Sequence, residues 1–318
     1  MTIFVGLDLH RAQITYDALD ADTGEVRAGR IRPANRGTVA AFLARTRGAD
    51  QEVVVAVEAM TGWRFFAEEC ARAGVEVHLA EPAETRERQD RKRRAKTDKL
   101  DARLLRELLM QKRLPESWIA PPHILDLRAK VRRRKTLVDQ RTQWLQRIHA
   151  VLFHHGVAVH AGQLGRLCAE QAREQLAGLD LPGSAVQQNT VALGIIEHLN
   201  GEVAGLDREL ERFARRQPGC RALMAHYGIG PCVSTAILAE LGDTRRMSSS
   251  RQAVRCAGLD VTVHQSDARS RGGHLSRQGS PVLRWAAFEA RRAPPARARP
   301  TTSTTWSSKT ASERTVRR

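Results

Sequence analysis

The sequence lacks the features of an exported, membrane-bound or disulfide-stabilised protein. Its five cysteines include no CxxC pair, which argues against a structural zinc site and against a disulfide framework. No apolar run approaches the roughly 20 residues that cross a bilayer. The N-terminus, MTIFVGLDLH, has no basic segment followed by a long apolar one. We therefore expect a soluble, cytoplasmic protein with reduced thiols and no membrane partner.

Acidic residues are scarce relative to basic ones. The 318 residues contain 52 Lys and Arg against 35 Asp and Glu, which gives a formal net charge of +17 at pH 7. A charge of this size attracts polyanions, and nucleic acid is the first candidate. The length suggests two domains, enough chain to bury hydrophobic cores.

The first 82 residues predict a mixed sheet with helices packed on it. Short segments rich in β-branched residues predict five strands, at 3–9, 14–20, 26–32, 52–59 and 75–81. Apolar residues at helical spacing predict two helices, at 37–47 and 62–74. Three strands that can form hairpins, followed by helix, strand, helix and strand, give the element order of the ribonuclease H-like α/β fold. Fold order alone says little about function.

The rest of the chain predicts a long helical linker and a mainly α-helical C-terminal domain. A helix fits Asp98 to about Lys112, and a second fits 124–155, where Arg134 and Arg141 interrupt a heptad-like apolar seam. This second helix is either a dimerising coil or a helix packed on its own chain. A third helix is expected at 184–216. The Arg-, Ser- and Thr-rich stretch from Pro294 predicts disorder or an aberrant, frameshifted end.

Two aspartates, Asp98 and Asp101, follow the most basic stretch of the chain, RERQDRKRRA. Helix capping explains this pair by itself, with Asp98 as the N-cap and Asp101 at the third helical position. Salt bridges within the helix explain it less well, because the residues four places on are Ala102 and Leu105.

Two further acidic residues favour a metal-binding, catalytic role for Asp98 and Asp101 over a helix-capping role. Asp8 lies inside an apolar strand, and Glu58 ends the strand VVVAVE. A buried carboxylate is costly unless it is paired, protonated or metal-bound, although either acid could instead face water at a strand end. Strands one and four are neighbours in a ribonuclease H-like sheet, so a helix carrying acids at i and i+3 can complete a cluster of four carboxylates. Oxygen ligands suit Mg²⁺ or Mn²⁺, which support phosphodiester chemistry.

Basic and glycine residues supply the expected nucleic-acid contacts. The run before Asp98 can hold a phosphate backbone beside the metals. The stretch YGIGPCVSTAILAEL has the form of a helix-hairpin-helix turn, although a Gly-rich turn that only connects two packed helices has the same sequence pattern. Ser266 lies in the polar segment HQSDARSRGG, where the pattern alone favours a solvated loop serine. The expected contacts are Arg91, Lys92, Arg93, Arg94, Lys96, Gly228, Gly230, Arg269, Arg271, Arg277 and Arg284.

Together, the motifs GLDLH, VEAMTGW, KTDKLDAR, GIGP and AGLDVTVHQSDARSRGGHLSRQGSPVLRW resemble the DEDD transposases of insertion-sequence family one hundred and ten, relatives of the Piv and MooV DNA invertases. The resemblance runs from about Ile3 to about Ala293. It implies a RuvC-like domain whose catalytic, metal-binding acids are Asp8, Glu58, Asp98 and Asp101, and a C-terminal domain whose nucleophile is Ser266. It also implies a recombinase in which Ser266 forms a covalent phosphoserine link to DNA.

The resemblance further implies dimers paired into tetramers, joined partly by a coil at 124–155, and guided by a structured bridge RNA that pairs with donor and target DNA. Two features depart from the family pattern: Asp267 stands where many members have glycine, and the tail replaces further helices. The expected domains are a catalytic domain (1–120), a helical linker (121–216), a C-terminal transposase domain (217–293) and the tail (294–318).

Two other functions fit the residues. A Mg²⁺-dependent endonuclease of the Holliday-junction-resolvase type would need only the four carboxylates and water. A catalytically inactive copy would still bind DNA or RNA through its basic patches.

Overall fold

The computed structural model describes residues 2–48, 51–88, 97–157, 169–266 and 269–292. The chain divides into two compact units, Met1–Ile119 and a second that begins at Ala120. The expected boundary between the helical linker (121–216) and the C-terminal transposase domain (217–293) stays a prediction. The basic run with Arg91, Lys92, Arg93, Arg94 and Lys96 lies outside the described residues, as do Asp267 and the tail 294–318.

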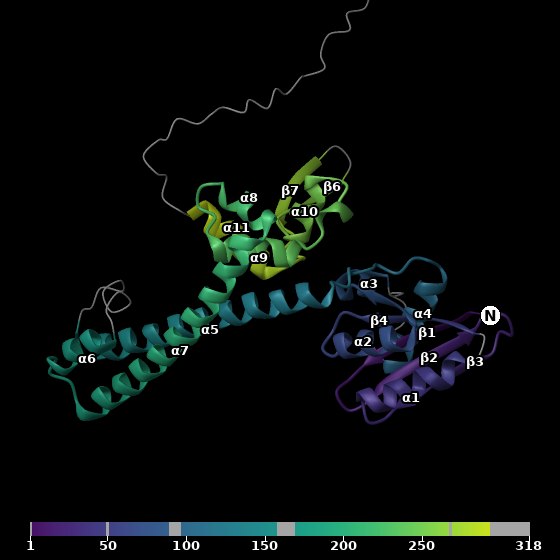
Figure 1. Cartoon of the computed structure of the whole chain (residues 1–318), viewed down its shortest axis with the longest axis horizontal. Coiled ribbons are helices and arrows are strands. Elements are labelled where there is room, and N and C mark those ends of the chain that lie inside the picture. Colours follow the sequence, from purple (N-terminus) through teal and green to yellow (C-terminus); the bar gives the residue numbers. More distant parts are fainter. Residues whose placement is uncertain (1, 49–50, 89–96, 158–168, 267–268, 293–318) are drawn as a thin grey trace, which may run out of the picture. The chain divides into compact units, whose positions relative to one another are not determined.

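The first unit is built on a five-stranded sheet in the order β3-β2-β1-β4-β5 (Figure 1). β1 pairs antiparallel with β2 and parallel with β4, and β4 pairs parallel with β5. This mixed sheet with its helices confirms the expected ribonuclease H-like α/β arrangement. The strands are β1 (Thr2–Leu9), β2 (Ile14–Asp20), β3 (Val26–Ile31), β4 (Glu52–Glu58) and β5 (Glu76–Ala80).

Alternation along the strands separates the two faces of this sheet. Odd-numbered residues of β1, such as Val5 and Leu7, belong to the main core with α1 (Arg36–Arg47) and α2 (Trp63–Ala73). On the opposite face, Phe4 packs with Val54 and Ala56 of β4 and with Leu105 and Leu109 of α4 (Asp98–Met110). The period of two therefore places the acids at positions 8 and 58 on the face that α4 covers.

The second unit is dominated by two long helices, α5 and α7, which lie side by side (Figure 1). The expected long helix is confirmed as α5, and the expected helix at 184–216 as α7. The elements are α5 (Pro122–His154), α6 (Ala169–Ala177), α7 (Gly183–Arg216), α8 (Pro218–Met224), α9 (Pro231–Leu241), a 3-10 turn η1 (Thr244–Arg246), α10 (Ser250–Cys256), β6 (Val261–Ser266), β7 (Arg269–Leu275) and α11 (Pro281–Arg292).

The seam of α5 packs on its own chain. Ile148 and Leu152 are fully buried in a cluster that includes Ile196 of α7. The two arginines that interrupt the seam also find partners on α7: Arg134 forms an ion pair with Asp207, and Arg141 Nη1 donates to Asn200 Oδ1 at 3.1 Å. Because these arginines are paired, they do not break the helix packing.

One strand and two short helices were not predicted from the sequence pattern. The Arg- and Gly-rich segment expected as a loop forms β7, which pairs antiparallel with β6. Its sequence, RSRGGHL, has no β-branched residue, so propensity does not predict a strand. Gly273 permits the pairing, since a Cβ there would lie 2.2 Å from Thr262 Oγ1. The helix α3 (Pro82–Glu87) and α6 were also not expected.

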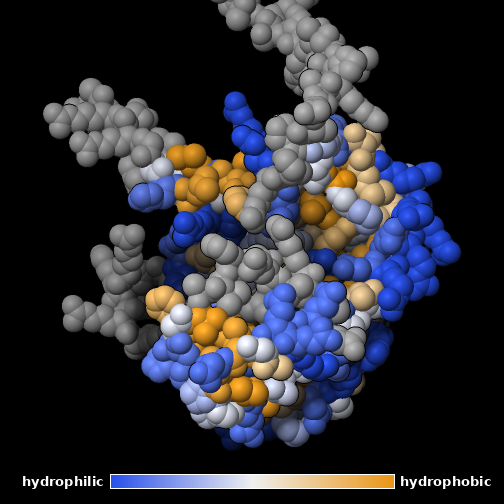
Figure 2. Space-filling view, turned by 90° about the vertical axis from the view of Figure 1, so that its left-hand side faces the viewer, coloured by the Kyte–Doolittle hydropathy of each residue, from blue (hydrophilic) through white to orange (hydrophobic). Residues whose placement is uncertain are grey.

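On the face shown in Figure 2, hydrophilic residues predominate among the coloured ones, and hydrophobic residues form smaller patches between them. Among the described helices, none is long and apolar enough to cross a membrane.

Candidate metal-binding active site

Two of the expected acids lie at the carboxyl ends of neighbouring parallel strands. Asp8 is the next-to-last residue of β1, and Glu58 is the last of β4. The register pairs Leu7 with Val57, so one step further places Asp8 beside Glu58 on the face of α4. Asp8 is only 9% exposed, which rules out the explanation that it faces water at a strand end. Glu58 is half-buried.

The other two acids lie in the first turns of α4. The expected capping role of Asp98 is wrong by one position: Thr97 is the N-cap, and its hydroxyl accepts from the Leu100 amide at 3.4 Å. Threonine fills this role well because its side-chain oxygen reaches the third amide of the helix. Asp98 is therefore the first helical residue and Asp101 the fourth, so the two lie on neighbouring positions of one helix face.

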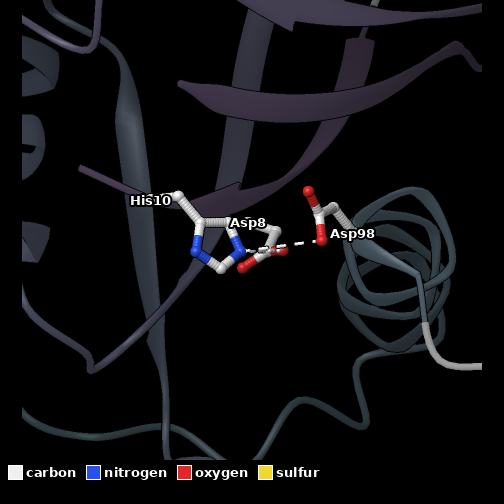
Figure 3. Close-up of side chains that lie close together, drawn as sticks. All are labelled: Asp8, His10 and Asp98. Carbon is white, nitrogen blue, oxygen red and sulfur yellow. Dashed lines mark hydrogen bonds and ion pairs between the residues drawn. The ribbon is translucent and has the colours of Figure 1, made fainter. Parts of the chain in front are cut away.

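Asp98 contacts the sheet instead of capping its helix. The side chains of Asp8, His10 and Asp98 converge, with one potential ligand atom from each lying within 4.8 Å of the others. His10 Nε2 lies 3.0 Å from Asp8 Oδ2 and 3.7 Å from Asp98 Oδ1 (Figure 3). The fold thus joins the end of β1 to the start of α4, across about 90 residues of sequence.

The electrostatics of this cluster favour a cation. Burial raises the pKa of Asp8 above its ordinary value, and the negative charges of Asp98 and Asp101 raise it further, while His10 opposes the shift. These two charges act on Asp8, so Asp101 contributes to the same electrostatic site. A divalent cation would relieve both the burial cost and the repulsion.

Polar residues of the β1–β2 hairpin support the cluster. Gln13 Nε2 lies 3.5 Å from Asp98 Oδ2, and Arg32 Nε donates to Gln13 Oε1 at 2.8 Å. Thr15, directly opposite Asp8 in the register, is fully buried, and its Oγ1 has no hydrogen-bond partner among the described residues. A buried, unpaired hydroxyl opposite Asp8 fits a site with room for a bound water.

Sequence reasoning missed His10, Gln13 and Thr15. A signal was present, since all three follow Asp8 within seven residues in DLHRAQIT, at the turn of a predicted hairpin. None belongs to a fixed ligand spacing, so only the hairpin register shows that they lie near the acids.

The remaining expected residues that the structure describes lie in the second unit. Ser266 ends β6, and Arg269 begins β7 with Arg271 in the same strand; for these three the structure describes the backbone alone. Arg277 is exposed. Arg284 Nη1 donates to the carbonyls of Ala257, Arg277 and Gly279 at 3.0, 3.2 and 3.1 Å, which holds the loop before α11.

The GIGP turn lies between α8 and α9, so two helices flank it as expected. Gly228 has a φ of 85°, which favours glycine, whereas Gly230 is an extended N-cap of α9 with a φ of −90°. Of the two glycines, only Gly228 is required by its backbone conformation.

Comparison with known proteins agrees with this architecture. Residues 5–155 match the DEDD transposase model of the IS110 group, and residues 220–307 match the model described as "Transposase IS116/IS110/IS902 family". The "Putative transposase y4rJ" of Sinorhizobium fredii is 30% identical over 313 residues, which cover 89% of this chain and 78% of that protein. The "Probable family 20 transposase" of Pseudomonas aeruginosa is 25% identical over 235 residues, covering 73% of this chain and 68% of that protein.

The match of residues 5–155, which contain the mixed sheet, puts the chain in the class of DEDD transposases. The chain belongs to the IS110 family of these transposases. It is therefore an enzyme whose substrate is DNA, and the family's DEDD site suggests the use of a divalent metal.

Proposed function

We propose that this transposase cuts and rejoins DNA with Asp8, Glu58, Asp98 and Asp101 as metal ligands and Ser266 as nucleophile. The observation that carries the metal site is the convergence of Asp8 and Asp98, from opposite ends of the first unit's sequence, within one cluster of potential ligand atoms. Mg²⁺ or Mn²⁺ bound there would neutralise the acids and polarise the phosphodiester. Glu58 supports the same site through its place beside Asp8 in the sheet.

The proposed reaction is a pair of transesterifications. The Ser266 hydroxyl loses its proton and attacks a DNA phosphorus; one P–O bond breaks, a deoxyribose hydroxyl leaves with a proton, and a phosphoserine link forms. A deoxyribose hydroxyl of another strand then attacks the phosphoserine and regenerates Ser266. Each step exchanges one phosphodiester bond for another, so the bond energy is conserved until the strands are rejoined.

Nucleic-acid binding is proposed to use the basic residues of both halves, because a net charge of +17 favours polyanions. The candidates expected from the sequence are the basic run 91–96 and the arginines Arg269 and Arg271. Arg277, exposed beside α11, and the α8–α9 turn with Gly228 and Gly230 extend this set. Arg284 would contact phosphate through the guanidinium nitrogens other than Nη1.

We further propose, from the family resemblance, that a structured bridge RNA pairs with donor and target DNA, and that dimers assemble into tetramers. The same resemblance is the basis for proposing a relationship to the Piv and MooV recombinases. The positive charge supports an RNA partner as well as DNA, since both present phosphates.

A covalent trapping assay tests the mechanism. The purified protein is incubated with DNA of the element ends, RNA transcribed from the flanking sequence and Mg²⁺, then denatured, and DNA attached to protein is measured. We expect an adduct in the wild type that disappears in Ser266→Ala and in Asp101→Ala. Matched controls are Ser250→Ala and Asp139→Ala, which alter an exposed serine and an exposed aspartate of the second unit and should leave the adduct unchanged.

Other outcomes favour the alternatives. Cleavage without an adduct, unaffected by Ser266→Ala, would show that water is the nucleophile, as in a resolvase-type endonuclease. Salt-sensitive DNA binding with no cleavage in any divalent metal would identify an inactive copy. Omitting the RNA from the same reaction tests guidance, because a guided enzyme should then lose the adduct.

A further inference from the structure

The His10 imidazole lies close to the carboxylates of both Asp8 and Asp98 (Figure 3). We infer that His10 is itself a ligand of the divalent cation and that this nitrogen shifts the metal preference from Mg²⁺ towards Mn²⁺. The inference rests on the proposed carboxylate site and adds a residue outside the Asp, Glu, Asp, Asp set.

The distances fit ligands of one ion. Adjacent ligands of an octahedral cation with bonds of about 2.1 Å lie about 3.0 Å apart, and opposite ligands about 4.2 Å apart. His10 Nε2 lies 3.0 Å from Asp8 Oδ2 and 3.7 Å from Asp98 Oδ1. With all three atoms within 4.8 Å of one another, small side-chain shifts bring them onto a single coordination sphere.

The backbone holds His10 in this place. The residue directly follows β1, and its amide donates to the Gln13 carbonyl at 3.0 Å, across the turn of the β1–β2 hairpin. Leu9 pairs with Ile14, so the strand register is fixed up to the residue before His10. The position of the imidazole is therefore set by the same hairpin that positions Asp8.

Burial differs between the three side chains in a way that suits an open metal site. The Asp8 side chain is 12% exposed, whereas those of Asp98 and His10 are 41% and 51% exposed. A cation held between them would be anchored on the buried acid and would remain accessible to water and to a phosphate oxygen.

The chemistry of the donor atoms gives the metal preference. Mg²⁺ strongly prefers oxygen ligands and gives up its water reluctantly, whereas imidazole suits transition metals. A set of carboxylates with one imidazole therefore binds Mn²⁺ more tightly than a set of carboxylates with water. Replacing the imidazole by an amide should reduce Mn²⁺ affinity while leaving Mg²⁺ affinity nearly unchanged.

Pulsed electron paramagnetic resonance tests coordination directly, because a nitrogen bound to Mn²⁺ modulates the electron spin echo. The full-length protein is loaded with Mn²⁺ alone, and the wild type is compared with His10→Gln. The matched control is His78→Gln, since His78 also lies between two acids, with Nε2 3.1 Å from Glu76 and Nδ1 2.9 Å from Glu116. We expect the ¹⁴N modulation in the wild type and in His78→Gln, and its loss in His10→Gln.

Titration gives the second readout. His10→Gln should weaken Mn²⁺ binding by about tenfold, a size typical of altered metal surroundings, and change Mg²⁺ binding measured by competition by less than about twofold. A wild-type protein that binds Mn²⁺ without ¹⁴N modulation would overturn the inference, even if His10→Gln weakened binding. Equal loss of Mn²⁺ and Mg²⁺ affinity would also contradict it.

Asp98→Asn separates this inference from the proposed function. If Asp98→Asn weakens Mn²⁺ binding and the wild type shows no nitrogen signal, the carboxylate site stands and His10 is not a ligand. If Mn²⁺ binding is unaffected by Asp98→Asn, the proposed metal site itself is wrong. Circular dichroism of each variant excludes loss of the fold as the cause.

Discussion

Gly6 of β1 lies directly against Ala102 of α4: a Cβ at position 6 would come within 2.0 Å of the Ala102 carbonyl oxygen and 2.5 Å of the Arg106 amide. Both of these are backbone atoms, which cannot move without the helix. The absence of a side chain at Gly6 therefore lets α4 lie on the sheet, and this close packing brings Asp98 to Asp8.

Gly6→Ala is expected to displace α4 from the sheet and to lower the free energy of unfolding by about 1–3 kcal/mol, the usual cost of overpacking. Mn²⁺ affinity should fall as well, because the two carboxylates separate. Urea unfolding and Mn²⁺ titration measure the two effects. Gly37→Ala on α1, where the added Cβ meets only Asn35 Oδ1 at 3.6 Å, is the control and should change neither quantity by much.

Asp17→Ala should be strongly destabilising. Asp17 of β2 forms an ion pair with Arg106 of α4, and the two residues are 8% and 5% exposed. Removing one partner leaves a buried charge, which costs about 3–5 kcal/mol, whereas the exposed pair of Arg103 with Glu107 contributes at most about 1 kcal/mol. Urea unfolding of Asp17→Ala and Arg103→Ala compares them; equal, small losses would contradict the importance of the buried pair.

Asp8→Asn should stabilise the metal-free protein at neutral pH. The folded-state pKa of Asp8 is raised above its ordinary value of 3.8. Its neutral form therefore favours folding below that value, and this contribution is lost as the pH rises through the raised pKa. At pH 7 the carboxylate opposes folding, so Asp8→Asn should raise the Tm in a chelator by on the order of 2 °C.

Added metal should raise the Tm of the wild type more than that of Asp8→Asn. The Tm advantage of Asp8→Asn should disappear near pH 3.5 and should reverse when Mg²⁺ or Mn²⁺ is added at pH 7, because the wild type gains a bound cation. Thermal scans across pH, with and without metal, give both results. A lower Tm for Asp8→Asn in the chelator at pH 7 would show that its bond to His10 outweighs the burial cost.

Ile148→Ala tests whether the α5 seam packs within its own chain. Ile148 is fully buried against α7 residues, so the truncation should cost about 2–5 kcal/mol through lost contacts and a cavity. Because the seam packs on α7 of the same chain, this loss should be the same at every protein concentration. A loss that appears only in dilute protein would instead assign these residues to a dimeric coil.

Much of the secondary structure of the first unit can be predicted from the sequence, because the residues within each short strand or helix favour the same conformation. VVVAVE predicts a buried strand by β-branching alone, and the observed β4 covers Glu52–Glu58. By contrast, β7 has no such pattern, and it depends on pairing with Thr262 and its neighbours. Local propensity thus predicts elements whose residues share one preference, and fails where a partner strand supplies the hydrogen bonds.

The residue types of Asp8, Glu58, Asp98 and Asp101, with the net charge of +17, are determined by the sequence alone, and they point to metal chemistry on nucleic acid. Tertiary structure decided the rest. It showed that Asp98 lies by Asp8 and His10 at the end of β1 and does not cap α4, because Thr97 does so. It also brought His10 between the acids, since only the hairpin register and the close packing of α4 on Gly6 set these side chains within ligand distance.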